Sequence, residues 1–96
     1  MKKISLLGAT GSIGIQTIDI ITAQPEKFQL VAFSAGRNIE KAREIIMQLK
    51  PELVSMQEEA DAIILSKEFP YITFTYGQKG LVEVATHPNT TVLVNA

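Results

Sequence analysis

Three glycines and two hydroxyl residues follow the first apolar run of the chain, in the stretch LLGATGSIG. The glycines recur every third residue, at Gly8, Gly11 and Gly14, with Thr10 and Ser12 between them. Glycine lets a phosphate approach the backbone, and the start of a helix offers it unpaired N–H groups. The spacing G-x-x-G-x-x-G differs from the commoner G-x-G-x-x-G, so a tight turn that binds nothing is the alternative.

Each glycine has an expected role if the turn joins a strand to a helix. We expect Gly8 to leave the strand in a backbone conformation that other residues avoid. Gly11 would leave room for a phosphate, and Gly14 would let the helix pack closely. No Gly-Lys-Ser/Thr sequence follows, which excludes a kinase-type phosphate loop. The turn therefore predicts a site for the pyrophosphate of a nucleotide.

The end of the second apolar run bears on which nucleotide binds. It reads SAGRN, residues 34–38, and holds no acidic residue. NAD-binding proteins usually have Asp or Glu there to hold the ribose hydroxyls. The planar guanidinium of Arg37 suits a 2′-phosphate instead, which favours NADP. The alternative is that Arg37 is a solvated charge before a helix.

Apolar runs alternate with amphipathic stretches along the whole chain. Strands are expected at Lys3–Gly8, Phe28–Ala35, Glu52–Met56, Tyr71–Gly77 and Thr90–Ala96. Helices are expected at Ser12–Gln24, Asn38–Lys50, Glu58–Phe69 and Lys79–His87. Helical crossovers of this length make neighbouring strands parallel. The pattern predicts an α/β fold, a Rossmann-like doubly wound parallel sheet of about five strands with helices on both faces, and it puts the glycine turn at the ligand-binding switch point.

Several single residues have expected places in this fold. Gly14, Ile18 and Ile21 share a helix face that should be buried, as do Ile39, Ala42, Ile46 and Leu49 in the next helix, for which Asn38 is the expected N-cap. We expect Met47 and Met56 in the core or at its edge. Asn95 ends the last strand near the switch point, where it either faces the ligand or begins a turn.

Composition limits the classes of function. The 96 residues are enough for one domain, and the net charge of -1 gives no general attraction to nucleic acid or an anionic membrane. Residues 1–50 hold 7 basic and 4 acidic residues, and residues 51–96 hold 2 and 6, so the glycine turn lies in the basic half. There is no cysteine, which excludes disulfides and thiolate chemistry. The apolar run at the N-terminus is too short for a signal peptide, so we expect a cytoplasmic protein.

Other polar residues give no support for catalysis. The acidic residues Glu58, Glu59 and Asp61 are interpreted as the start of a helix and not as a metal site. His87, the one histidine, is interpreted as a surface residue after a helix. No catalytic or metal-binding residue is therefore assigned in this chain.

The order of short motifs resembles one enzyme family. GATGSIGIQTIDII, VAFSAGRN, KPELV, GLVEVA and VLVNA together are similar to the N-terminal NADPH-binding domain of 1-deoxy-D-xylulose 5-phosphate reductoisomerase. The resemblance extends over essentially the whole chain. It implies that Thr10, Gly11, Ser12 and Ile13 line the pyrophosphate, and that Gly36, Arg37 and Asn38 hold the 2′-phosphate end. Many members carry Lys where this chain has Arg37, and either cation would serve.

The resemblance also implies an activity for a longer protein. The family depends on NADPH and a divalent metal, Mg or Mn, and converts the sugar phosphate 1-deoxy-D-xylulose 5-phosphate to 2-C-methyl-D-erythritol 4-phosphate in non-mevalonate isoprenoid synthesis. Residues 1–96 would be its NADPH-binding domain. The metal-binding and C-terminal parts would lie beyond position 96, so the chain alone is expected to be inactive, and a homodimer is expected. The alternative is a stand-alone, non-catalytic NAD(P)-binding regulatory module.

Overall fold

In the computed structural model, which describes residues 1–96, nine elements alternate between strand and helix. The strands are β1 (Lys2–Leu7), β2 (Phe28–Ser34), β3 (Leu53–Met56), β4 (Thr73–Tyr76) and β5 (Val92–Asn95). The helices are α1 (Ser12–Ala23), α2 (Ile39–Leu49), α3 (Glu59–Glu68) and α4 (Gly77–Ala85). The predicted number and order of elements are confirmed, and most bounds differ from prediction by one or two residues.

All five strands form one parallel sheet in the order β4-β3-β2-β1-β5. From β1 the chain moves outward through β2 and β3 to β4, and then returns across the sheet to β5 on the other side of β1. The switch point therefore lies between β1 and β5, directly beside the turn that follows β1. The predicted doubly wound parallel sheet is confirmed.

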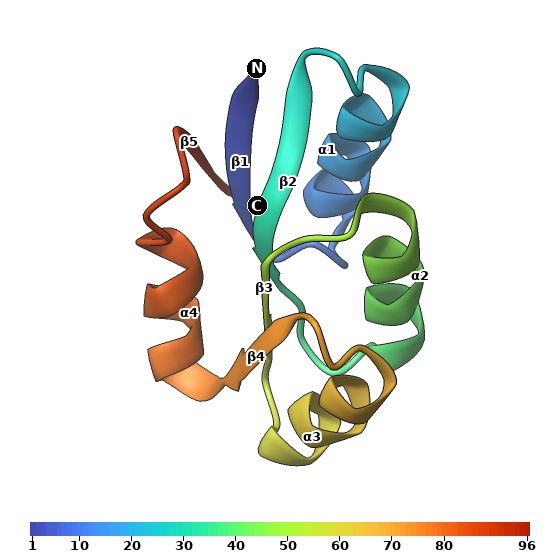
Figure 1. The fold of residues 1–96 in the computed structure, drawn as a ribbon, viewed down its shortest axis with the longest axis vertical. Helices are drawn as coiled ribbons and strands as arrows, with labels where there is room; N and C mark the ends of the chain where they lie inside the picture. The colour runs from blue at the N-terminus through green and yellow to red at the C-terminus, as the bar shows by residue number, and fades with distance from the viewer.

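Helices cover both faces of the sheet, but unequally. Figure 1 shows α1 and α2 on one side of the sheet and α4 on the other. The larger apolar cluster lies under α1, α2 and α3, and includes Leu6, Ile21, Phe33, Ile46 and Leu65. The smaller cluster lies under α4 and consists of Val31, Ala32, Leu53 and Val84, with Leu7 packed against it. The strands β1 to β3 are thus buried on both faces, as the long apolar runs in the sequence predicted.

The helices begin and end for local reasons. The predicted buried face of α1 is confirmed at Gly14, Ile18 and Ile21. Asn38 is the N-cap of α2, as predicted, and its side-chain oxygen accepts a hydrogen bond from the N–H of Lys41 at 3.0 Å. Lys50 ends α2 in the left-handed conformation with φ of 49°, which lets the chain turn back into β3.

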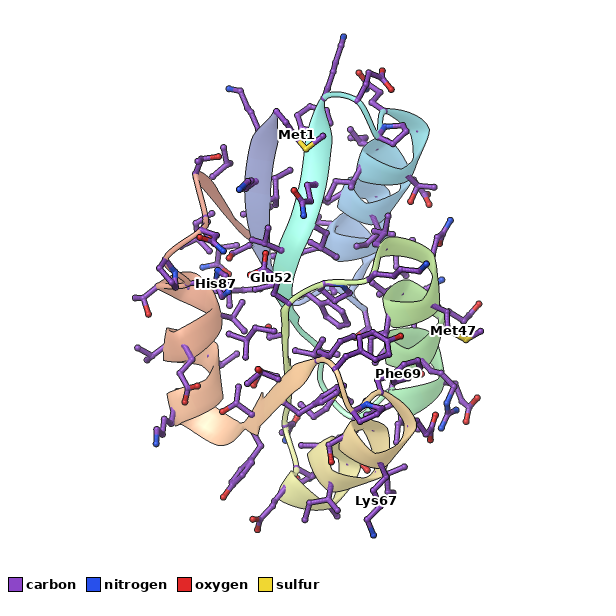
Figure 2. The ribbon with its side chains drawn as sticks, in the orientation of Figure 1. Met1, Met47, Glu52, Lys67, Phe69 and His87 are labelled. Atoms are coloured by element: carbon purple, nitrogen blue, oxygen red, sulfur yellow. The ribbon has the colours of Figure 1, made fainter.

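Two expectations about the helices are wrong. Helix α4 begins at Gly77, directly after β4, instead of at Lys79, and it ends at Ala85. Met47 is 64% exposed, because it follows the buried pair Ile45–Ile46 and points outward from α2 (Figure 2). Met56 is buried, as predicted. No helix has both the length and the apolar character that a membrane span needs.

Candidate functional site

A pocket of about 450 Å³ lies at the edge of the sheet where the strands end. Residues at the ends of β1 to β3 and in the first half of α4 line it: Gly8, Ser34, Ala35, Gly36, Met56, Gln57, Gly77, Gln78 and Leu81. Ligands of open α/β sheets bind at this carboxyl edge, near the switch point. The pocket is therefore the first candidate for a ligand site.

The glycine turn beside the pocket is built as the sequence predicted. Gly8 has φ of +80°, a conformation that residues with a side chain rarely adopt. A Cβ atom on Gly14 would lie 2.1 Å from the carbonyl oxygen of Gly8, so the start of α1 packs directly on the turn. A Cβ atom on Gly11 would meet only the oxygen of Gly8, at 3.7 Å. Two of the glycines are thus required by the fold, whereas Gly11 is not.

The first turn of α1 offers unpaired donors beside the glycine turn. Gly11 is the N-cap and accepts the first helical hydrogen bond from the N–H of Ile15 at 2.8 Å. The N–H groups of Ser12, Ile13 and Gly14 have no carbonyl one turn earlier within the helix. No side chain caps them, because the N-cap is a glycine. These amides and the positive end of the helix dipole form a site suited to an anion.

Ser34 fastens the glycine turn to the end of β2. Its side chain is buried, and its hydroxyl accepts a hydrogen bond from the N–H of Gly8 at 3.0 Å. The carbonyl of Ser34 accepts a second one from the N–H of Ala9 at 2.8 Å. From the sequence, the end of β2 was notable only because it holds no acidic residue. In the structure, Ser34 has a role of its own, because its two hydrogen bonds hold the glycine turn in place.

Arg37 lies in the turn between β2 and α2 and is 71% exposed in its side chain. Its Nη2 atom donates to the Oε1 atom of Glu58, the residue before α3, at 3.0 Å. The residue before Arg37, Gly36, lines the pocket. The side-chain oxygen of Asn38 caps α2, so only its amide nitrogen remains for a ligand.

The predicted site residues fall into two groups around the pocket. Gly36 lines it, and Arg37 and Asn38 continue from Gly36 into α2. The residues Thr10, Gly11, Ser12 and Ile13 lie in the other group, at the start of α1, and Ile13 is 61% exposed. Both groups follow strand ends at the same sheet edge, but Thr10–Ile13 are not part of the pocket lining.

One wall of the pocket, formed by the end of β3 and by α4, was not predicted from the sequence. Gln57, Gly77, Gln78 and Leu81 all line the pocket. A Cβ atom on Gly80 would lie 2.1 Å from the Oγ atom of Ser55, so the glycine lets α4 approach β3 closely. The signal for this wall was present, because the first residues after successive parallel strands meet at one edge. It was overlooked because α4 was expected to begin two residues later.

A polar cluster lies at the opposite edge of the sheet, where the strands begin. His87 is only 12% exposed in its side chain, and its Nε2 atom lies 3.6 Å from Oε1 of Glu52 (Figure 2). The same oxygen accepts a hydrogen bond from the amide of Asn89 at 3.0 Å. The interpretation of His87 as a surface residue is therefore wrong. These contacts join the loop after α4 to the loop before β3.

The acidic residues do not gather into a metal centre. No group of three His, Cys, Asp or Glu side chains in residues 1–96 is arranged to hold a metal ion. Glu59 accepts a hydrogen bond from the hydroxyl of Tyr76, which raises the pKa of that tyrosine. Glu58 is paired with Arg37. The residues Glu59 and Asp61 lie in the first turn of α3, as predicted from their favourable place at the positive end of a helix.

Comparison with protein families gives one match over nearly the whole chain. The model of the 1-deoxy-D-xylulose 5-phosphate reductoisomerase family matches residues 4–96. Curated proteins of that name from Lysinibacillus sphaericus and Listeria innocua are 71% and 57% identical over 96 residues. In both cases the alignment covers 100% of this chain and 25% of the relative. The chain therefore spans a quarter of the length of the curated relatives it matches.

Solved structures share the fold. A crystal structure of DOX-P reductoisomerase in complex with NADPH, fosmidomycin and magnesium has a TM-score of 0.89 and 24% identity, covering 97% of this chain and 24% of that one. The 1-deoxy-D-xylulose 5-phosphate reductoisomerase from Zymomonas mobilis in complex with NADPH has a TM-score of 0.82 and 24% identity, covering 92% and 24%. At this identity the likeness establishes the fold alone.

Proposed function

Because this chain belongs to the 1-deoxy-D-xylulose 5-phosphate reductoisomerase family, we propose that it binds NADPH at the carboxyl edge of its sheet. The observation that carries the proposal is the glycine turn, in which Gly8 and Gly14 admit no side chain and Gly11 leaves open space beside unpaired amides. When bound, NADPH supplies the hydride for a reduction.

The pyrophosphate would lie at the start of α1. The N–H groups of Ser12 and Ile13 and the hydroxyls of Thr10 and Ser12 are the donors available to it. Gly11 leaves the phosphate oxygens free to approach, because no Cβ atom stands there. Ser34 stabilises the glycine turn, because it accepts hydrogen bonds from the N–H groups of Gly8 and Ala9 and so keeps the turn in one conformation.

The adenosine end would occupy the pocket and the turn after β2. A volume of about 450 Å³ accommodates a nucleoside, and its lining by Met56, Leu81 and glycine backbone suits a flat, largely apolar ring. Gly36, Arg37 and the amide nitrogen of Asn38 would hold the 2′-phosphate. Arg37 supplies a charged fork that a 2′-hydroxyl could not use equally well.

For the longer protein we propose the reaction of the family. It would rearrange and reduce 1-deoxy-D-xylulose 5-phosphate with NADPH and a divalent metal, in the cytoplasm and as a homodimer. The side chains of residues 1–96 do not form a metal site. We propose cofactor binding for this chain and metal binding for other segments of the longer protein, and we expect the chain alone to be inactive. A stand-alone NAD(P)-binding regulatory module remains the alternative.

The experiment that tests this proposal is a calorimetric titration of the 96-residue chain with NADPH and NADH. We expect saturable binding of both, with the lower dissociation constant for NADPH. No binding of NADPH, with a folded chain by circular dichroism, would contradict the proposal. Reductoisomerase assays with Mg²⁺ or Mn²⁺ test the second part, because turnover by the purified chain would refute the assignment of catalysis to other segments.

A further inference from the structure

Glu58 brings a negative charge to the one arginine of the candidate 2′-phosphate site. Its Oε1 atom lies 3.0 Å from Nη2 of Arg37, and the two side chains are 49% and 71% exposed. Glu58 is the residue before α3, where a side chain commonly caps the helix, yet its carboxylate makes no cap hydrogen bond. The carboxylate turns to Arg37 instead.

Backbone contacts hold this pair together independently of the two side chains. The N–H of Gln57 donates to the carbonyl of Gly36 at 3.2 Å, so the loop after β3 is joined to the turn after β2. One residue earlier, the N–H of Ala35 donates to the carbonyl of Ser55 at 2.9 Å. These two hydrogen bonds hold the backbone just before Glu58 next to the backbone just before Arg37, independently of the ion pair.

We propose that Glu58 is a specificity-determining residue, which competes with the 2′-phosphate for Arg37 and narrows the preference for NADPH over NADH. This inference rests on the proposed NADPH binding. A 2′-phosphate carries nearly two negative charges and needs the same guanidinium that Glu58 occupies. The exposed ion pair is weak enough to be exchanged, but the carboxylate remains nearby and repels the phosphate. A 2′-hydroxyl meets no such repulsion and can donate to the carboxylate, as it does in NAD-binding proteins.

The test is the isosteric change Glu58→Gln in the 96-residue chain, with calorimetric titration of NADPH and NADH. We expect the dissociation constant for NADPH to fall about three- to tenfold, because one repulsion in water is removed. The constant for NADH should stay the same or rise. Glu26→Gln removes the same charge from the loop before β2, at the other edge of the sheet, and should change neither constant.

A double variant distinguishes competition between Glu58 and the 2′-phosphate for Arg37 from a general repulsion of the phosphate by Glu58. In an Arg37→Ala background, Glu58→Gln should give less than half of the gain in NADPH affinity seen with Arg37 present. The gain should also shrink from about 0.05 M to about 0.5 M salt, since both groups are exposed. An unchanged or weaker NADPH affinity in Glu58→Gln would overturn the inference, as would an equal gain in both backgrounds. If the unmodified chain binds no NADPH at all, the proposed function itself fails, and this inference fails with it.

Discussion

The two halves of the candidate site differ in whether backbone or side-chain atoms form them. At the start of α1, the site is backbone: the turn has a residue at positive φ, and a Cβ atom on Gly14 would lie 2.1 Å from another residue. At the start of α2, side chains form the site. The side chain of Arg37 is 71% exposed, and its ion pair is with the exposed carboxylate of Glu58. If NADPH binds as proposed, substitutions in the first half should act on the fold and on any dinucleotide, whereas substitutions in the second half should act on the choice between NADPH and NADH.

The largest expected effect is that of Gly14→Ala. The added methyl group would meet the carbonyl oxygen of Gly8 and the carbonyl of Ala9, so α1 must move away from the turn. We expect the free energy of unfolding to fall by at least about 2 kcal/mol, as in overpacked cores, and NADPH binding to be lost. Urea unfolding followed by circular dichroism measures the first effect. An unchanged midpoint would show that the contact is not tight.

Arg37→Ala should separate specificity from stability. The affinity for NADPH should fall about ten- to hundredfold, the loss of one bidentate charged contact, with NADH affinity changed by less than about twofold. The midpoint of urea unfolding should stay the same, because Arg37 is a surface residue. Lys27→Ala, in the loop before β2, is the matched loss of a positive charge. Equal losses for NADPH and NADH would place Arg37 outside the 2′-phosphate site.

Gly11→Ala tests the first half without the steric clash of Gly14→Ala. A Cβ atom on Gly11 has only one ordinary contact, so stability should fall by no more than about 1 kcal/mol, the cost of alanine as an N-cap. The affinities for NADPH and NADH should both fall about tenfold, because the methyl group would stand where the pyrophosphate common to both is proposed to approach. Calorimetry measures both. Loss of NADPH binding alone would contradict the division between the halves.

The edge strand beside the first half gives a prediction about assembly. β5 pairs only with β1, and Leu93 is 47% exposed. Unpaired edges of this kind favour association with another chain, so we expect the isolated chain to form dimers. Leu93→Lys should weaken the dimer about tenfold, whereas changes at Val92 or Val94 would also disturb the core they pack against. Light scattering over a concentration series measures this, and a monomer at every concentration would contradict it.

The smallest expected effect comes from the ion pair between Arg43 and Glu68, which joins α2 to α3. Arg43 of α2 donates to both carboxylate oxygens of Glu68 in α3, at 2.6 and 2.8 Å, and this lowers the pKa of Glu68. A carboxyl group with a lowered pKa stabilises the fold above its unfolded pKa of about 4.3, and the contribution is lost as the pH falls through the folded pKa.

Glu68→Gln should therefore make the free energy of unfolding depend less on pH at the acid end of the pH range. The unmodified chain should lose more stability than the variant between about pH 5 and about pH 3, and the two curves should converge at the acid end. Urea midpoints at several pH values measure this difference. NADPH affinity at neutral pH should change little. Parallel pH profiles would show that the pair does not contribute to folding.

The sequence predicted most of the fold, because the relevant signals are local. Alternating apolar runs and amphipathic stretches predicted all nine elements, and the buried face of α1 at Gly14, Ile18 and Ile21 follows from helical periodicity. Errors came where periodicity is ambiguous. Met47 follows two buried isoleucines in α2, and only packing against the sheet decided that it faces solvent. The start of α4 was misplaced because Gly77 resembles a break and not a first helical residue.

By itself the sequence determined the glycine turn, since a chain with glycine at positions 8 and 14 can form this strand–turn–helix unit and a chain with side chains there cannot. It also determined that no acidic residue ends β2. The tertiary structure alone decided what surrounds these positions. It brought the buried hydroxyl of Ser34 under Gly8, placed α4 and Gln57 along the pocket, and set Glu58 against Arg37 from 21 residues away. The reason is that parallel strands gather their ends at one edge, whatever their separation in sequence.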